Sequence, residues 1–244
     1  NAGQAGSLDL GQHGVAVAQV HAVGAHLRDV SETALLFSEG AHREPVDEHV
    51  LGRGEEGRER GERYWRIFEQ LRVELGYADY LGALQRYRLE TPDDARILEM
   101  SSFLIDYPFP DRLFAGALDA IAAIKQFGPA VILSDGDAVF QPRKAMRSGL
   151  WSAVDGNVLI YVHKEHMLDD VERRFPAGHY VMVDDKLRIL AAMKEIWRER
   201  LTTMWVVQGH YATDPEAVKR YPPADVRLAS ISELGEAART RFGS

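Results

Sequence analysis

Three short apolar segments of this chain end in polar side chains of the kinds that bind phosphate and a divalent cation. These side chains are Ser134 and Asp135 after 130–133, Lys164 after 158–162, and Asp184 and Asp185 after 180–183. A hydroxyl can bind a phosphate oxygen, an ammonium can neutralise its charge, and adjacent carboxylates are oxygen ligands for Mg²⁺. The three segment ends therefore indicate a site for Mg²⁺ and a small phosphorylated substrate.

The adjacent carboxylates Asp184 and Asp185 also fit a simpler interpretation. An acidic pair between a strand and a helix can be a solvated turn, because the dipole of the helix favours negative charge at its N-terminus. Two neighbouring carboxylates repel each other and lose hydration when buried, so a cation usually accompanies them. Lys164 offers that cation, which favours the metal site over the turn.

The positions of these side chains depend on the strands that precede them. From residue 130 onward, short apolar segments alternate with helical segments of about ten residues. The expected strands are 130–133, 158–162, 180–183, 203–207 and 226–229, and the expected helices are 142–150, 168–175, 187–200 and a last one from 231. This alternation predicts an α/β fold, with a parallel sheet covered by helices on both faces. The carboxyl ends of parallel strands lie along one edge, which brings the polar residues together.

The chain before this region divides into two parts. Apolar residues at three- and four-residue steps predict helices from 62 to 75 and from 80 to 89, and Pro92 starts a third. Residues 1–60 differ in composition: the segment 14–23 alternates weakly, as a strand would, and 51–61 is rich in charge and broken by glycine, so a loop or frayed helix is expected. We expect an atypical segment at 1–60, a small helical unit at 61–105 and an α/β core at 106–244.

Composition excludes several classes of function. A net charge of −8 argues against a nucleic-acid or anionic-membrane surface as the partner. There is no apolar run long enough to span a bilayer. The absence of cysteine excludes disulfides and thiol catalysis, and it fits a reducing compartment. A cytoplasmic protein is the expectation.

From Glu62 to Leu234, the chain resembles the haloacid dehalogenase-like (HAD) hydrolases. Val131–Asp135 is similar to the second motif of this family, an apolar strand that ends in Ser or Thr. Lys164 is similar to the lysine of the third motif. Val181–Asp185 is similar to the fourth motif, a strand that ends in acidic residues.

The resemblance implies a Rossmann-like core with a helical cap at 61–105, and Asp106–Gly116 resembles the segment that returns from cap to core. It also implies Mg²⁺-dependent hydrolysis through a covalent aspartyl intermediate, most often of a phosphate ester. Ser134 and Lys164 would then be catalytic, Ser134 and Asp135 would contact the substrate, and Asp184 and Asp185 would bind Mg²⁺.

The first motif of the family is not visible in this sequence. That motif is an apolar strand followed by Asp-x-Asp, which supplies the nucleophile, and nothing in residues 1–60 matches it. Its absence would also remove the central strand of the sheet. One hypothesis is that residues 1–58 are a wrong-frame reading of the true N-terminus. The other is a divergent and catalytically inactive protein that still binds a phosphorylated ligand, with 14–23 standing in for the missing strand.

Two further readings are weaker. A dinucleotide-binding enzyme requires Gly-x-Gly-x-x-Gly after a strand, which this sequence lacks. A response-regulator receiver also uses an acidic pair and a lysine, but it would not carry the helical insert. Asp137, Gln208 and His210 follow expected strands near the same edge, where they could contact the substrate, but turn or surface roles are the expectation.

Overall fold

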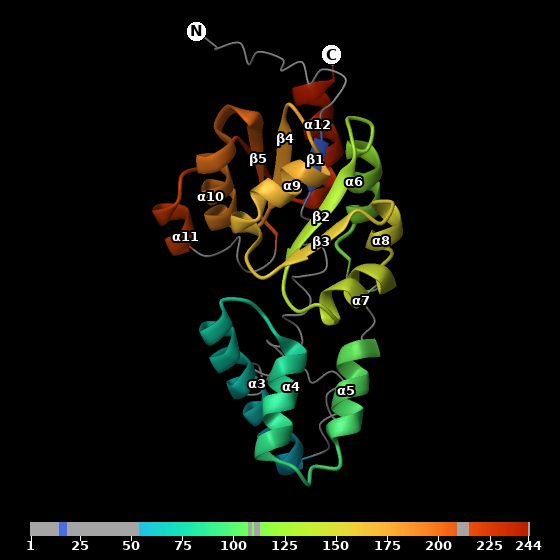
Figure 1. Ribbon diagram of the computed structural model, residues 1–244, viewed down its shortest axis with the longest axis vertical. Coiled ribbons are helices and arrows are strands. Elements are labelled where there is room, and N and C mark those ends of the chain that lie inside the picture. The colour runs from blue at the N-terminus through green and yellow to red at the C-terminus, as the bar shows by residue number, and fades with distance from the viewer. Residues whose placement is uncertain (1–14, 19–53, 107–108, 110–112, 209–214, 244) are drawn as a thin grey trace.

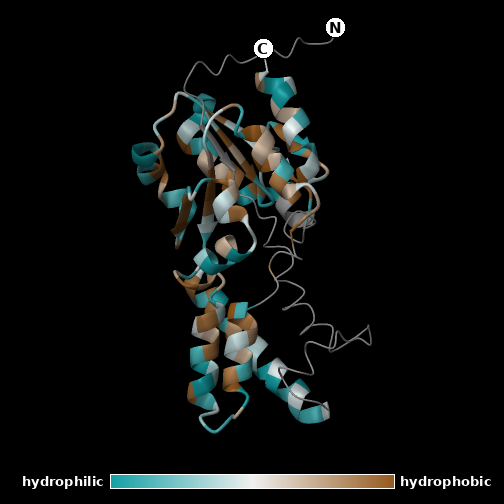
Figure 2. Cartoon of the chain, turned by 90° about the vertical axis from the view of Figure 1, so that its right-hand side faces the viewer, coloured by the Kyte–Doolittle hydropathy of each residue, from teal (hydrophilic) through white to brown (hydrophobic). Residues whose placement is uncertain are grey.

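The computed structural model describes residues 15–18, 54–106, 109, 113–208 and 215–243. An α/β body contains the sheet, and three helices form a separate layer beyond one edge of it (Figure 1). Polar and apolar residues alternate around the helices of both parts (Figure 2). None of the helices in the described ranges has the length and apolar character needed to cross a membrane.

The sheet has six strands in the described part of the chain, and every neighbouring pair is parallel. Their order is β3-β2-β1-β4-β5-β6. The strands are β1 (Val15–Ala18), β2 (Ala130–Asp135), β3 (Val158–Tyr161), β4 (Tyr180–Asp184), β5 (Leu201–Val206) and β6 (Val226–Leu228). The parallel α/β sheet expected from the sequence is therefore confirmed.

The central position of the sheet belongs to β1. Ala16 pairs with Ala130 of β2 on one side and with Val181 of β4 on the other. The prediction that segment 14–23 contains a strand, which would stand in for the missing one, is confirmed for Val15–Ala18, so the core does not lack its middle strand. The wrong-frame hypothesis for 1–58 stays a hypothesis, since most of those positions lie outside the described residues.

Each face of the sheet is covered by helices. On one face, Val131, Leu133 and Met182 pack against α9 (Leu168–Arg174) and α10 (Leu187–Trp197). On the opposite face, Ile132 and Val183 belong to the apolar cluster that includes α6 (Ala117–Ile124) and α12 (Leu234–Phe242). Successive residues of a strand point to opposite faces of the sheet, and both faces are buried under helices. The strands are therefore continuous apolar runs in the sequence.

The helix predicted at 142–150 is divided in two. The structure has α7 (Phe140–Arg147) and α8 (Leu150–Ala153), separated by Gly149 with φ of 83°. Such a positive φ favours glycine and ends the first helix. Pro142 lies in the first turn of α7, where a missing N–H costs nothing. The remaining connections include η4 (Lys164–His166), η5 (Arg198–Arg200), η7 (Ile231–Glu233) and α11 (Pro215–Arg220).

The helical layer consists of α3 (Gly54–Leu75), α4 (Tyr80–Glu90) and α5 (Ile97–Asp106). The prediction of a loop or frayed helix at 51–61 is wrong from Gly54 onward. Gly57 and Gly61 are buried and continue the buried stripe formed by Tyr64, Phe68 and Leu71. The glycines therefore extend the packed face of α3 instead of interrupting the helix.

The third helix of the layer begins at Ile97, later than the expected start at Pro92. Asp94 stabilises the intervening turn. Its carboxylate accepts hydrogen bonds from Arg60 Nε at 2.7 Å and from the backbone N–H of Arg96 at 2.9 Å. It also accepts a hydrogen bond from the hydroxyl of Tyr87. This carboxylate therefore links α3 and α4 to the residue before α5. The turn between α4 and α5 lies at the end of the layer that is remote from the sheet (Figure 1).

The helical layer contacts the carboxyl edge of the sheet. The rings of Tyr80 on α4 and Phe140 on α7 lie 4.8 Å apart. On another side, Arg143 donates to the carbonyl of Ile105 and to the carboxylate of Asp106, both at 2.9 Å, and Arg147 also binds Asp106. These contacts place the helices directly over the strand ends that carry the polar residues.

Candidate active site

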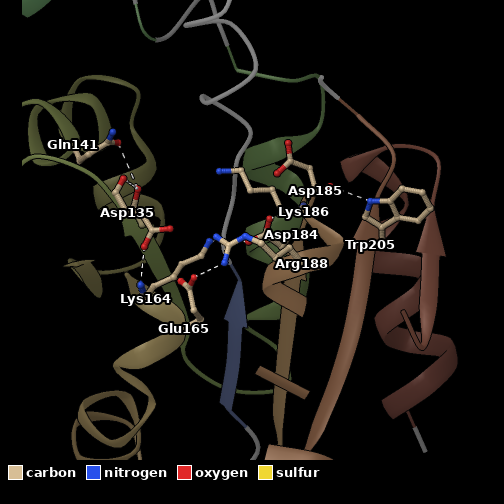
Figure 3. A network of polar contacts seen from close by, with 10 residues as sticks. Asp135, Gln141, Lys164, Glu165, Asp184, Asp185, Lys186, Arg188 and Trp205 are labelled. Atoms are coloured by element: carbon tan, nitrogen blue, oxygen red, sulfur yellow. Dashed lines mark hydrogen bonds and ion pairs between the residues drawn. The ribbon is translucent and has the colours of Figure 1, made fainter. Parts of the chain in front are cut away.

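The sheet order brings the predicted site residues to the two sides of β1. Ser134 and Asp135 end β2 on one side, and Asp184 ends β4 on the other. Lys164 is the first residue of η4, which follows β3. Figure 3 shows Asp135, Lys164 and Asp184 around the end of the central strand. The structure therefore gathers at one edge the side chains that the sequence distributes over 52 positions, from Ser134 to Asp185.

Lys164 and Asp184 form a buried ion pair. The Nζ of Lys164 lies 2.7 Å from Oδ2 of Asp184, and both side chains are 0% exposed. The second oxygen of Asp184 accepts the backbone N–H of Lys186 at 2.8 Å. A buried charge requires both a counter-ion and hydrogen bonds, and this pair has them.

Asp185 is the residue of the site whose ionised form is unfavourable. The residue is 6% exposed and lies directly after Asp184. Burial, followed by the neighbouring charge of Asp184, raises the pKa of Asp185 to about 8. Its backbone carbonyl accepts a hydrogen bond from Trp205 Nε1 of β5 at 3.0 Å, which fixes the turn after β4. A cation beside Asp185 would therefore favour the ionised form.

The donor set of this edge fits Mg²⁺. Mg²⁺ commonly takes one or two protein carboxylates and completes its shell with water and substrate phosphate. Asp184 and Asp185 offer two carboxylates, and burial together with the charge of Asp184 raises the pKa of Asp185 to about 8. No cluster of three or more His, Asp or Glu suited to a metal occurs among the described residues. The edge thus provides a two-carboxylate site.

Ser134 carries a loosely held hydroxyl. Its Oγ lies 3.3 Å from the carbonyl of Asp135 and 3.5 Å from Oε1 of Gln141, both long for hydrogen bonds. Gly136 has φ of 139°, which favours glycine, and the side chain of Gln141 packs against its backbone, since a Cβ there would meet Nε2 of Gln141 at 2.7 Å. The hydroxyl of Ser134 can exchange these weak contacts for a ligand oxygen at little cost.

Asp135 is oriented toward the protein. Its Oδ1 accepts the backbone N–H of Lys164 at 2.7 Å. Burial raises the pKa of Asp135, whereas the ammonium and the N–H of Lys164 favour the ionised form. The predicted substrate ligand thus makes its strongest observed contact with another residue of the site.

Sequence reasoning missed several cationic groups near the same edge. Burial and then the charge of Lys186 lower the pKa of Lys144, on α7, to about 7, while Asp185 opposes this shift. Arg188 binds the buried carboxylate of Glu165 at 2.6 Å (Figure 3). Lys186 and Arg188 lie at the start of α10, where cations oppose the helix dipole. Their unfavourable position at the start of a predicted helix could have indicated a role for Lys186 and Arg188. No sequence pattern distinguishes Lys144.

Asp137 and Gln208, with predicted turn or surface roles, both accept backbone N–H groups. Asp137 accepts the N–H of Val139 at 3.0 Å and that of Phe140 at 2.5 Å, at the start of α7, as a turn residue does. Gln208 accepts the N–H of Ile231 at 2.7 Å, which links the end of β5 to η7. His210 lies outside the described residues.

The helical layer reaches the α/β body close to Lys164. Gly76 ends α3 with φ of 77°, and a Cβ there would lie 2.8 Å from Cε1 of His163. His163 directly precedes Lys164, so the loop between α3 and α4 lies against the residue that introduces the lysine. The loop between α3 and α4 therefore lies next to the edge of the sheet that carries the site residues.

One solved structure is similar to this chain in both sequence and fold. It is the crystal structure of a haloacid dehalogenase-like hydrolase from Burkholderia xenovorans LB400, with 53% sequence identity and a TM-score of 0.77. The match covers 92% of this chain and 98% of the other. Neither protein-family models nor curated proteins gave a match.

More distant structures share the fold. A HAD hydrolase from Bacillus subtilis, bound to magnesium, has 13% identity and a TM-score of 0.54 over 93% of this chain and 99% of its own. A HAD family hydrolase from Deinococcus radiodurans R1, with bound phosphate and sodium, has 12% identity and a TM-score of 0.55 over 93% and 95%. At these identities the similarity concerns the arrangement of the elements.

Proposed function

Because this chain belongs to the haloacid dehalogenase-like hydrolases, we propose that it is a Mg²⁺-dependent hydrolase of small phosphate esters. The observation that carries the proposal is the buried pair of Lys164 and Asp184 beside Asp185, at the carboxyl edge of the sheet. Burying the carboxylate of Asp185 beside this pair is unfavourable unless a cation accompanies it, and carboxylates with such a raised pKa are found preferentially at functional sites.

The residues divide into two roles. Asp184 and Asp185 would hold Mg²⁺, which when bound neutralises charge on phosphate oxygens. Lys164 keeps its ammonium fixed by the contact with Asp184 at 2.7 Å, so it needs no reorganisation to stabilise negative charge nearby. Ser134 would donate its loosely held hydroxyl to an oxygen of the transferred group. The loop between α3 and α4, which lies beside His163, would keep water away from this edge.

Two distant relatives support the ligands named here. The Bacillus subtilis protein contains magnesium, and the Deinococcus radiodurans protein contains phosphate. Both ligands match what the charges of this edge favour: a cation for Asp184 and Asp185, and an anion for Lys164.

A second candidate function rests on the sequence that follows the central strand. Ala18 of β1 pairs with Val183, the residue before Asp184. The chain continues after Ala18 as Gln19-Val20-His21, whereas the resemblance implies Asp-x-Asp after this strand. An amide cannot form the expected aspartyl intermediate. This observation favours a protein that binds Mg²⁺ and a phosphorylated ligand without hydrolysing it.

Turnover of p-nitrophenyl phosphate, with and without Mg²⁺, tests the two candidates. The full chain, with its own N-terminal residues, is compared with Ser134→Ala, Lys164→Ala and Asp184→Asn. Hydrolysis predicts Mg²⁺-dependent turnover, lost in Lys164→Ala and Asp184→Asn. Ser134→Ala removes only long contacts and should fold normally, so a fall in its kcat/KM reports on the site and not on stability.

The alternative has its own result. If the full chain gives no turnover but binds inorganic phosphate in the presence of Mg²⁺, and Asp185→Asn abolishes that binding, the non-catalytic function is correct. If the chain neither turns over the ester nor binds phosphate, both candidates are wrong.

A further inference from the structure

The start of η4 has a backbone donor that its own turn cannot satisfy. Lys164 is the first residue of η4, and the first N–H groups of a helical turn have no partner within it. Lys164 is also completely buried, so water cannot bind this N–H. The partner is Oδ1 of Asp135, at 2.7 Å, from the neighbouring strand.

Asp135 reaches this donor because of the sheet register. Asp135 is paired with Tyr161 of β3, and the N–H of Gly136 donates to the carbonyl of Tyr161 at 3.0 Å. After Tyr161 the backbone leaves the ladder and turns into η4. The carboxylate of Asp135 thus continues the connection between the two strands beyond the last backbone hydrogen bond (Figure 3).

The two ends of Lys164 are therefore held from different strands. Its backbone is bound by Asp135 of β2, and its ammonium is bound by Asp184 of β4 at 2.7 Å. These strands lie on opposite sides of β1. The side chain of Lys164 consequently has a defined path from one side of the edge to the other.

Direct contact with the ligands of the proposed reaction suits Asp135 poorly. A carboxylate repels a phosphate, and no group of three possible metal-binding residues that would include Asp135 occurs in the described part of the chain. We infer that Asp135 is a positioning residue, which fixes the backbone of Lys164 so that its ammonium faces Asp184 and the phosphate. The role in catalysis rests on the proposed function, whereas the contact itself does not.

Hydrogen exchange at the backbone amide of Lys164 tests this inference without any assay of activity. Protein labelled with ¹⁵N-lysine reports Lys164 together with Lys194, an internal reference within α10. Asp135→Ala removes the acceptor, and Asp135→Asn keeps a carbonyl oxygen in the same place. Asp169→Ala, at an exposed aspartate of α9, is the matched control.

We expect slow exchange at Lys164 in the wild type, Asp135→Asn and Asp169→Ala, and exchange at least about tenfold faster in Asp135→Ala. Exchange at Lys194 should stay constant. Asp135→Leu, whose side chain has the same branching as Asn but no acceptor, should behave as Asp135→Ala does, which provides a second variant if the first does not fold. Unchanged exchange at Lys164 in a folded Asp135→Ala or Asp135→Leu protein would overturn the inference.

Kinetics separate positioning from substrate contact. In Asp135→Ala, kcat for p-nitrophenyl phosphate should fall about 10- to 100-fold with KM little changed, and Asp135→Asn should restore most of it. A raised KM in Asp135→Asn, with unchanged exchange at Lys164, would make Asp135 a substrate ligand instead. A wild-type chain without turnover would contradict the proposed function, while the exchange rates would still decide whether Asp135 fixes Lys164.

Discussion

A buried charge needs a partner of opposite sign and hydrogen bonds to its remaining atoms. Lys164 and Asp184 are such partners for each other, and the N–H of Lys186 binds the second oxygen of Asp184. The position of both residues could be predicted from the rule that parallel strands end at one edge. Their direct contact could not, because a sequence gives the order of the strand ends but no distance between them.

The first prediction concerns this buried pair. Lys164→Met should lower the free energy of unfolding by ~3–5 kcal/mol, because it leaves Asp184 buried without its counter-ion. Lys125→Met provides the control, since Lys125 binds Asp155 at 2.6 Å on the surface, with side chains 33% and 66% exposed. Its loss should be below ~1 kcal/mol. Urea unfolding measures both, and similar losses in the two variants would show that the contact with Asp184 stabilises little.

The second prediction concerns the titration of Asp185. Its folded pKa of about 8 exceeds the unfolded value of roughly 3.9, so the folded state binds this proton more tightly. The resulting contribution to stability is complete below about pH 4 and is lost as the pH rises through about 8. Mg²⁺ competes with the proton, and it should therefore raise the Tm more at pH 9 than at pH 6.

Thermal unfolding with and without Mg²⁺ at the two pH values measures this difference. Asp185→Asn is the control, because an amide cannot titrate and binds Mg²⁺ poorly. An equal shift of Tm by Mg²⁺ at pH 6 and pH 9 in the wild type would contradict the assignment of Asp185 to the cation.

At the scale of elements, packing overrode several local signals. Gly57 and Gly61 read as breaks in a helix, yet their lack of side chains lets α3 bury that face. β1 is only four residues long and is a strand because β2 and β4 pair with both of its edges. Such pairing is absent from any local window of sequence, whereas the longer apolar segments β2 and β4 could be predicted directly.

The third prediction concerns the turn between α4 and α5. Asp94 is 9% exposed and binds Arg60, the hydroxyl of Tyr87 and the N–H of Arg96. Asp94→Ala leaves these groups without their acceptor, and it should cost ~2–3 kcal/mol of stability. Asp93→Ala, at the exposed neighbouring residue, should be close to neutral.

Burial raises the pKa of Asp94, but its bonds to Arg60 and Tyr87 lower it more, so the net pKa is lowered. The contribution of Asp94 is therefore present above its unfolded pKa and is lost as the pH falls through the folded value. Urea unfolding at neutral and acidic pH checks both points. A difference between wild type and Asp94→Ala that persists unchanged in acid would show that the charge of Asp94 is unimportant.

In the molecule as a whole, the helical layer contacts the sheet at the carboxyl edge, which carries the charged residues of the site. Three contacts join the two parts: Tyr80 packs against Phe140, Gly76 approaches His163, and two arginines bind Asp106. A helical insert over a parallel sheet could be predicted from the order of elements and from the family resemblance. The residues at the joint could not, because their partners come from distant positions in the chain.

The edge formed by Lys164, Asp184 and Asp185 is proposed to bind a divalent cation. Paramagnetic broadening of backbone NMR signals by Mn²⁺, used in place of Mg²⁺, tests this binding without requiring turnover. We expect broadening concentrated at Asp184, Asp185 and Lys186, reversed by excess Mg²⁺ and lost in Asp185→Asn. Uniform weak broadening over the acidic surface, unchanged in Asp185→Asn, would contradict it.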